Sequence, residues 1–143
     1  MVGFLIAALS GALMSIQGVF NTQVTKQSGM WLASMFVQLT AFLVCLGAWM
    51  IKERTPIQSL LAVQPKYMLL GGVIGAFITV TVIQAMNSLG PAKAVLCIVV
   101  VQILVAYLIE LMGLFGVDRQ PFEWRKAIGM AIALVGLLIF KWK

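Results

Sequence analysis

The sequence predicts an all-α integral membrane protein with five transmembrane helices. Of its 143 residues, 62% are hydrophobic and only 10% are charged, and the mean hydropathy is +1.07. A water-soluble domain does not carry so apolar a composition. The apolar residues also form five runs, each near the roughly 20 residues that cross a bilayer core. One transmembrane domain, residues 1–143, is therefore expected, with spans at residues 2–24, 30–51, 67–87, 94–116 and 127–140.

Each run has boundaries that fit a helix in a membrane. The first has no charged segment before it and exceeds signal-peptide length, which predicts a retained helix. The longest break, KERTPIQSLLAVQPK, is expected to lie in the interface as a single amphipathic helix between Pro56 and Pro65. Pro91 marks the start of the fourth helix. The fifth run is short, but its flanks suit an interface anchor: Trp124, Arg125 and Lys126 before it, and Lys141, Trp142 and Lys143 after it.

The composition argues against an enzyme. Histidine is absent, and no nucleophile and base pair or metal-ligand set is visible, so no catalytic residue, metal or cofactor is expected. Cys45 and Cys97 fall inside spans without CxxC spacing and are interpreted as packing residues. The net charge of +6 comes from residues near the interfaces, where it indicates topology and contact with the lipid bilayer rather than nucleic acid.

The distribution of Lys and Arg leaves the orientation open. Five spans place the termini on opposite sides, with six basic residues in the breaks on the N-terminal side and four on the other. This favours a cytoplasmic N-terminus only weakly, so insertion in both orientations is plausible. Many transporters consist of inverted repeats. A single copy can form the same arrangement as a homodimer with inverted topology or as a heterodimer with an inverted homologue; a parallel dimer or a monomer is the alternative.

Small residues recur at helical spacing in three spans and predict seams where helices approach closely. The seam residues are Gly11, Ser15 and Gly18 in the first span, Gly71 and Gly75 in the third, and Gly129, Ala133 and Gly136 in the fifth.

Polar residues form a second pattern. Measured from the middle of each predicted span, four of them lie at about 4 to 6 Å toward the side opposite the N-terminus: Gln17, Gln38, Thr81 and Gln102. One glutamine in a span is commonly interhelical glue. Four at one depth on different helices favour a binding layer, with Asn21 one turn beyond Gln17 and nearer the interface.

Glu110 is the only carboxylate within a predicted span. It lies about 7 to 8 Å from the middle of that span, toward the N-terminal side. An acid inside a membrane suggests a functional site, although this one could also reach headgroups or a basic loop residue. In an inverted partner, Glu110 would lie near the depth of this chain's Gln17.

Several stretches together resemble the YdcZ-like family, a five-span branch of the drug/metabolite transporter (DMT) superfamily. They are GALMSIQGVFN at residues 11–21, GPAKAV at 90–95, QILVAYLIELMGLFG at 102–116 and PFEWRKAIG at 121–129. The resemblance implies half of a ten-helix inverted-repeat transporter, working as an antiparallel dimer whose cavity is lined by the first four helices. The family's marked positions fall on Gln17, Gly18, Asn21, Gln102, Glu110, Gly113 and Gly116.

The chain departs from many family members near its acid. Those members have aspartate at the position of Glu110, glycine at that of Val101 and histidine at that of Leu111. These differences argue against a shared proton relay.

We therefore predict a multi-pass protein of the bacterial plasma membrane that transports small solutes, most simply an exporter of a polar or cationic metabolite by alternating access. Glu110 would attract a cation, carry a proton or tie a gate to a loop arginine. The alternative is a non-transporting assembly or accessory subunit whose polar layer is interhelical glue; a passive channel would need a continuous polar path. The predicted substrate-binding residues are Gln17, Asn21, Gln38, Gln102 and Glu110.

Overall fold

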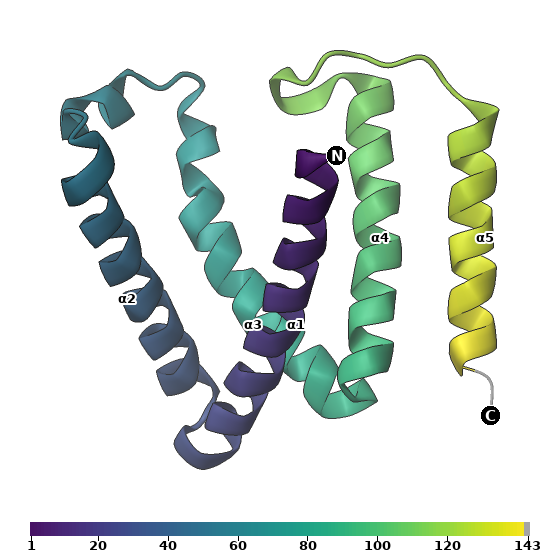
Figure 1. The fold of residues 1–143 in the computed structure, drawn as a ribbon, viewed down its shortest axis with the longest axis horizontal. Coiled ribbons are helices and arrows are strands. Elements are labelled where there is room, and N and C mark those ends of the chain that lie inside the picture. Colours follow the sequence, from purple (N-terminus) through teal and green to yellow (C-terminus); the bar gives the residue numbers. More distant parts are fainter. Residues whose placement is uncertain (142–143) are drawn as a thin grey trace. The chain divides into compact units, whose positions relative to one another are not determined.

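The computed structural model describes residues 1–141, which contain helices and no strand. Trp142 and Lys143, expected to anchor the fifth span, lie outside the described residues. The long helices of this part of the chain, labelled in Figure 1, are α1 (Val2–Ser28), α2 (Met30–Ala48), α3 (Gly71–Leu89), α4 (Pro91–Met112) and α5 (Trp124–Lys141).

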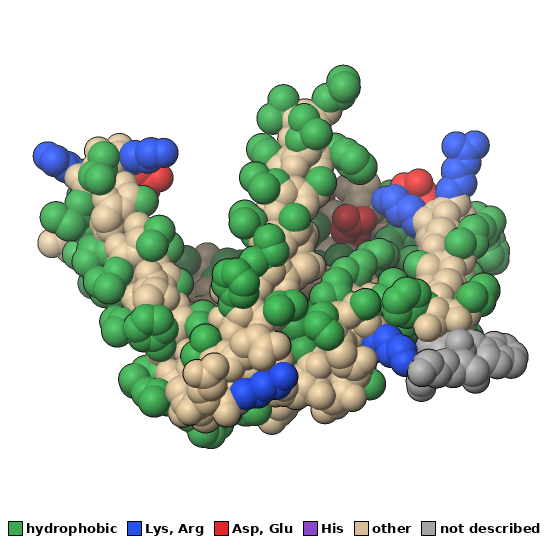
Figure 2. All heavy atoms as spheres, turned by 60° about the horizontal axis from the view of Figure 1, so that its bottom comes forward, with side chains coloured by type: hydrophobic (Ala, Val, Ile, Leu, Met, Phe, Trp, Pro, Cys, Tyr) green, Lys and Arg blue, Asp and Glu red, His purple; other side chains and the backbone are tan. Residues whose placement is uncertain are grey.

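Four helical segments within residues 1–141 are long and apolar enough to cross a membrane: Val2–Ser28, Met30–Glu53, Lys66–Leu89 and Pro91–Met112. The first three predicted spans fall inside these segments. On the face drawn in Figure 2, hydrophobic side chains cover the helices and the basic ones gather at helix ends. This distribution is typical of a multi-pass membrane protein, as predicted.

α5 is not among these four segments. It carries Arg125, Lys126 and Lys141, which confine its uncharged part to residues 127–140. That part is about 21 Å long, whereas a bilayer core is about 30 Å thick. The fifth crossing therefore stays a prediction.

The chain divides into two compact units, Met1–Ser88 and Leu89–Lys143. The first unit holds α1, α2 and nearly all of α3, and the second holds α4 and α5. The expected single transmembrane domain stays a prediction.

In the first unit, the packed end lies near the turn between α1 and α2. Gly29 has a φ of 84°, a conformation that favours glycine, and its N–H donates to the Thr25 carbonyl at 2.9 Å. α1 and α2 lie close at this turn and diverge away from it (Figure 1). The buried residues of the three helices are Gly18, Asn21, Thr22, Ala33, Ser34, Val80, Ile83 and Met86. The N-terminal half of α1 is correspondingly exposed.

The segment between α2 and α3 is helical in short pieces. A π-helical turn, Trp49–Glu53, continues α2, and 3₁₀ helices follow at Ile57–Ala62 and Lys66–Leu70. One helix therefore lies between Pro56 and Pro65, as predicted, and it is a 3₁₀ helix of six residues. Val63 is extended and ends the first 3₁₀ helix, and Pro65 disfavours helical backbone at the residue before it.

In the second unit, α4 begins at Pro91 as predicted but ends at Met112, so the predicted span end at residue 116 is wrong. The cause is local: Gly113 and Gly116 have φ values of 64° and 81°, and Phe115 also lies in the left-handed region. A glycine in this conformation commonly terminates a helix.

The loop after α4 folds back over the helix end. The Gln120 N–H donates to the Glu110 carbonyl at 2.9 Å, and Arg119 Nε donates to the Leu111 carbonyl at 3.1 Å. These bonds satisfy carbonyls that have no partner inside the helix.

Candidate functional site

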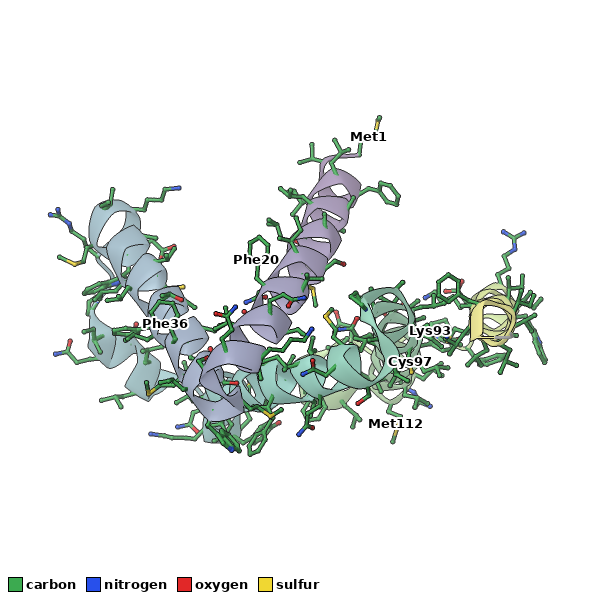
Figure 3. All side chains as sticks on the ribbon, turned by 90° about the horizontal axis from the view of Figure 1, so that it is seen from below. Met1, Phe20, Phe36, Lys93, Cys97 and Met112 are labelled. Atoms are coloured by element: carbon green, nitrogen blue, oxygen red, sulfur yellow. The ribbon has the colours of Figure 1, made fainter. Side chains whose placement is uncertain are left out.

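An open hollow of about 500 Å³ lies along α1. Its polar residues Ser10, Gln17 and Asn21 are spaced by seven and four positions, which places them on one face of the helix. The remaining lining residues are apolar: Leu13, Met14, Ile16 and Phe20. Figure 3 shows the Phe20 ring projecting from α1 on the side nearer to α2 in that view. The face thus combines two amides with an apolar rim.

Asn21 is the most enclosed polar residue of this hollow, with 9% of its surface exposed. Its carbonyl accepts a hydrogen bond from Thr25 Oγ1 at 2.8 Å, but its side-chain amide bonds to no residue within 1–141. Its amide atoms nevertheless remain accessible from the hollow, because among the described residues only Ser34 Oγ is a fully buried side-chain polar atom without a partner. Gln17, one turn away, is exposed and also has no side-chain hydrogen bond in the described part of the chain.

Gly18 lies between these amides in sequence but packs on another face. A Cβ added there would overlap the Met86 side chain of α3, with Sδ only 2.8 Å away. Gly18 therefore allows a close approach between α1 and α3, as predicted for the seam.

The other predicted seam positions contact little within the described chain. A Cβ added at Gly11, Gly71, Gly75, Gly129 or Gly136 would have no atom within 4 Å. Ser15 Oγ donates to the Gly11 carbonyl of its own helix at 3.0 Å, and Ala133 is half-buried. Their role in helix packing stays a prediction.

Gln38 acts as a bridge between helices. Its Nε2 donates to Thr79 Oγ1 of α3 at 3.2 Å, and that hydroxyl donates to the Gly75 carbonyl at 3.0 Å. Thr81 instead bonds to two carbonyls of its own helix, and Gln102 is exposed without a side-chain hydrogen bond in residues 1–141. Only part of the predicted layer therefore joins helices.

Glu110 belongs to a cluster at one end of the second unit. Lys126 Nζ lies 3.5 Å from Glu110 Oε2 and 3.1 Å from Glu123 Oε1. The same ammonium sits 5.7 Å from the centre of the Tyr107 ring, and the Tyr107 hydroxyl accepts from the Glu123 N–H at 3.0 Å. A hollow of about 420 Å³ adjoins this cluster, lined by Ile103, Ala106, Tyr107, Glu110, Lys126, Gly129 and Met130.

The cluster supplies Glu110 with a lasting counter-charge. Lys126, just before the predicted fifth span, has a pKa raised above 10.5, mainly because it donates a hydrogen bond to Glu123 and also because the charges of Glu123 and Glu110 favour the ammonium. Lys126 therefore stays protonated at neutral pH and loses its charge only as the pH rises past that pKa. The basic partner of Glu110 is thus Lys126, which fits the expectation that Glu110 could reach a basic residue outside the spans; the loop arginine, one of the predicted alternatives, does not pair with it among the described residues.

The observed end of α4 changes the expected depth of Glu110. Glu110 lies about 8.5 residues, or about 13 Å, from the middle of α4. Gln17 lies only about 3 Å from the middle of α1 on the opposite side, and Asn21 about 9 Å. In an inverted partner, Glu110 would therefore lie closer in depth to Asn21 than to Gln17.

Sequence reasoning missed several residues of these sites. Ser10 and Phe20 could have been found from their spacing around Gln17, and Thr79 from its position one turn after Gly75. Tyr107 and Lys126 meet through a loop that reverses the chain, and helical spacing carries no signal for that contact.

The helices, their apolar surfaces and the polar residues set into them define an α-helical, multi-pass membrane protein. Residues 2–139 match the model of the family DMT_YdcZ, described as "Putative inner membrane exporter, YdcZ". The chain belongs to this YdcZ family, whose description is of transport across the inner membrane, and its helices fit a multi-pass protein of that membrane. No curated protein and no solved structure matches the chain.

Proposed function

We propose that this protein exports a small polar or cationic metabolite across the inner membrane by alternating access in an antiparallel dimer. The observation that carries the proposal is the hollow on α1, where the Asn21 amide faces the open space and has no partner among the described residues. Its volume of about 500 Å³ is in the range of small-molecule sites.

The state of the glutamines favours transport over a purely structural role. If the polar layer were only glue, each amide would need a partner on a neighbouring helix. Gln38 has such a partner in Thr79. Gln17 and Gln102 are exposed and have none in residues 1–141, which leaves them free to contact a solute.

The proposed roles follow from these environments. Gln17 and Asn21 bind the solute, and Gln102 adds a second contact. Gln38 holds α2 against α3 beside the path. Glu110 and Lys126 act as an electrostatic gate near the membrane interface, because they pair at the end of α4.

An inverted second copy, or an inverted homologue, completes the transporter in this proposal. Support comes from seam glycines such as Gly11 and Gly71, which have open space beside them. Small residues of this kind allow close helix approach in lipid. The weak charge asymmetry between the two sides makes insertion in both orientations feasible.

Transport by purified full-length protein in liposomes tests the proposal. Substrate-dependent flux is expected for at least one member of a broad panel of neutral and cationic metabolites. Glu110→Gln should slow that flux by about tenfold, an effect of about 1.4 kcal/mol, because the gate loses its charge pair. Glu53→Gln, which removes a carboxylate outside this cluster, is the control and should keep the wild-type rate. Absence of flux across the panel, or a wild-type rate for Glu110→Gln, would contradict the proposal.

A further inference from the structure

We infer that the hollow on α1 selects an uncharged solute that joins an amide-like group to an apolar body. This inference rests on the proposed function and narrows its substrate class. The supporting observations are the charge, the hydrogen-bonding capacity and the apolar rim of the hollow.

The hollow contains no charged side chain. Its lining residues are one serine, one glutamine, one asparagine and four apolar residues. The nearest charged residue that follows on α1 is Lys26, five positions after Asn21 and therefore about 140° around the helix. A cation or anion placed here would lose hydration without gaining a counter-charge, which is strongly unfavourable in apolar surroundings.

The two amides require a ligand that both donates and accepts hydrogen bonds. Each amide offers two N–H donors and one carbonyl acceptor. Gln17 and Asn21 lie four residues apart, so their Cβ atoms are about 6 Å apart on one face. An anion would use only the N–H groups and a cation only the carbonyls. A carboxamide or urea group can hydrogen-bond to both the N–H donors and the carbonyl acceptors, and it would give the unpartnered Asn21 amide a partner.

The apolar rim of the hollow indicates that the rest of the ligand is apolar. Leu13, Ile16 and Phe20 flank the polar face, and Met14 adds an adaptable thioether. A small aromatic or branched body can therefore be covered while its amide meets Gln17 and Asn21.

The only carboxylate of the predicted spans does not supply a cation site to an incoming solute. Glu110 already carries the ammonium of Lys126 at 3.5 Å, and Lys126 also holds Glu123. A cationic solute would have to displace a built-in lysine.

Three probes of one shape test the charge selectivity directly: benzamide, which is neutral, benzamidine, a cation, and benzoate, an anion. Binding of each to full-length protein in nanodiscs is measured by saturation-transfer NMR and by competition at pH 7.5. Benzamide should bind at least about tenfold more tightly than either charged probe. Equal or tighter binding of benzamidine or benzoate, or no binding of benzamide, would overturn the inference.

Paired variants locate the effect. Gln17→Leu should weaken benzamide binding by about tenfold or more, whereas Gln23→Leu, on the same helix but outside the hollow, should leave it unchanged. Asn21→Asp should shift preference to benzamidine, and Asn87→Asp, an exposed position on α3, should not. If Asn21→Asp does not fold, the pair at Gln17 and Gln23 still decides the result. Equal effects of Gln17→Leu and Gln23→Leu would overturn the inference.

The two proposals can fail separately. Flux of cationic metabolites that is insensitive to Gln17→Leu would overturn the neutral hollow and leave export in place. Benzamide binding that depends on Gln17, without flux of any solute, would overturn export and retain the site.

Discussion

At Gly18 the main chain of α1 approaches Met86 of α3 so closely that an added Cβ would overlap the thioether. Gly11, two turns earlier in the same seam, has no atom within 4 Å of an added Cβ. The two glycines look equivalent in the sequence. The structure distinguishes them because the buried end of the first unit includes only the second half of α1.

Gly18→Leu should destabilise the protein by about 1 to 3 kcal/mol, because a larger side chain forces α1 away from α3. Gly18→Ala should have a smaller effect, since the flexible end of Met86 can move. Gly11→Leu is the matched control and should change the free energy of unfolding little. Unfolding in mixed detergent micelles measures the difference; equal stability of Gly18→Leu and Gly11→Leu would argue against the close contact.

At the scale of one element, the end of α4 depends on Gly113. Its φ of 64° is strained for any residue with a side chain, and an added Cβ would lie 3.1 Å from Arg119 Cβ. The same turn allows Arg119 and Gln120 to reach the Leu111 and Glu110 carbonyls.

Gly113→Ala should therefore lower stability by about 1 to 2 kcal/mol. Hydrogen exchange should show the Gln120 amide losing protection, because its bond to the Glu110 carbonyl depends on this turn. Gly129→Ala, in the open interior of α5, should be neutral or stabilising. Unchanged protection at Gln120 in Gly113→Ala would contradict this account of the helix end.

At the scale of the whole molecule, antiparallel assembly requires both orientations in one membrane, or two oppositely inserted chains. Single cysteines at Ser59, before α3, and at Ser88, in the last turn of α3, report the orientation once Cys45 and Cys97 are replaced by alanine. If the protein inserts both ways, each site should react with a membrane-impermeant maleimide from either side of intact and inverted membranes. Reaction of each site from one side only, when the chain is expressed alone, would exclude an inverted homodimer.

Much of the fold could be predicted from hydrophobic run length. The spans at residues 2–24, 30–51 and 67–87 lie inside the observed helices, and Pro91 marks the start of α4. The end of α4 was missed because residues 113–116 are as apolar as the helix, while their backbone leaves the helical region. Hydropathy does not report backbone dihedral angles.

Only part of the candidate site could be predicted from the spacing of residues in the sequence. Spacing placed Gln17 and Asn21 on one face, and the structure finds them lining one hollow. Spacing could not show that Gln38 bonds to Thr79 or that Lys126 reaches Glu110, because these contacts join residues distant in sequence. Such pairs depend on tertiary packing, which single-chain periodicity does not encode.

The contact between Gly18 and Met86 has a mechanical consequence. Methionine has an unbranched, readily rearranged side chain, and glycine opposite it presents a smooth stretch of backbone. A displacement of α1 along α3 would therefore require only a change of rotamer at Met86 for the two helices to remain in contact. A β-branched residue in place of Met86 has fewer rotamers available and would therefore resist such a displacement.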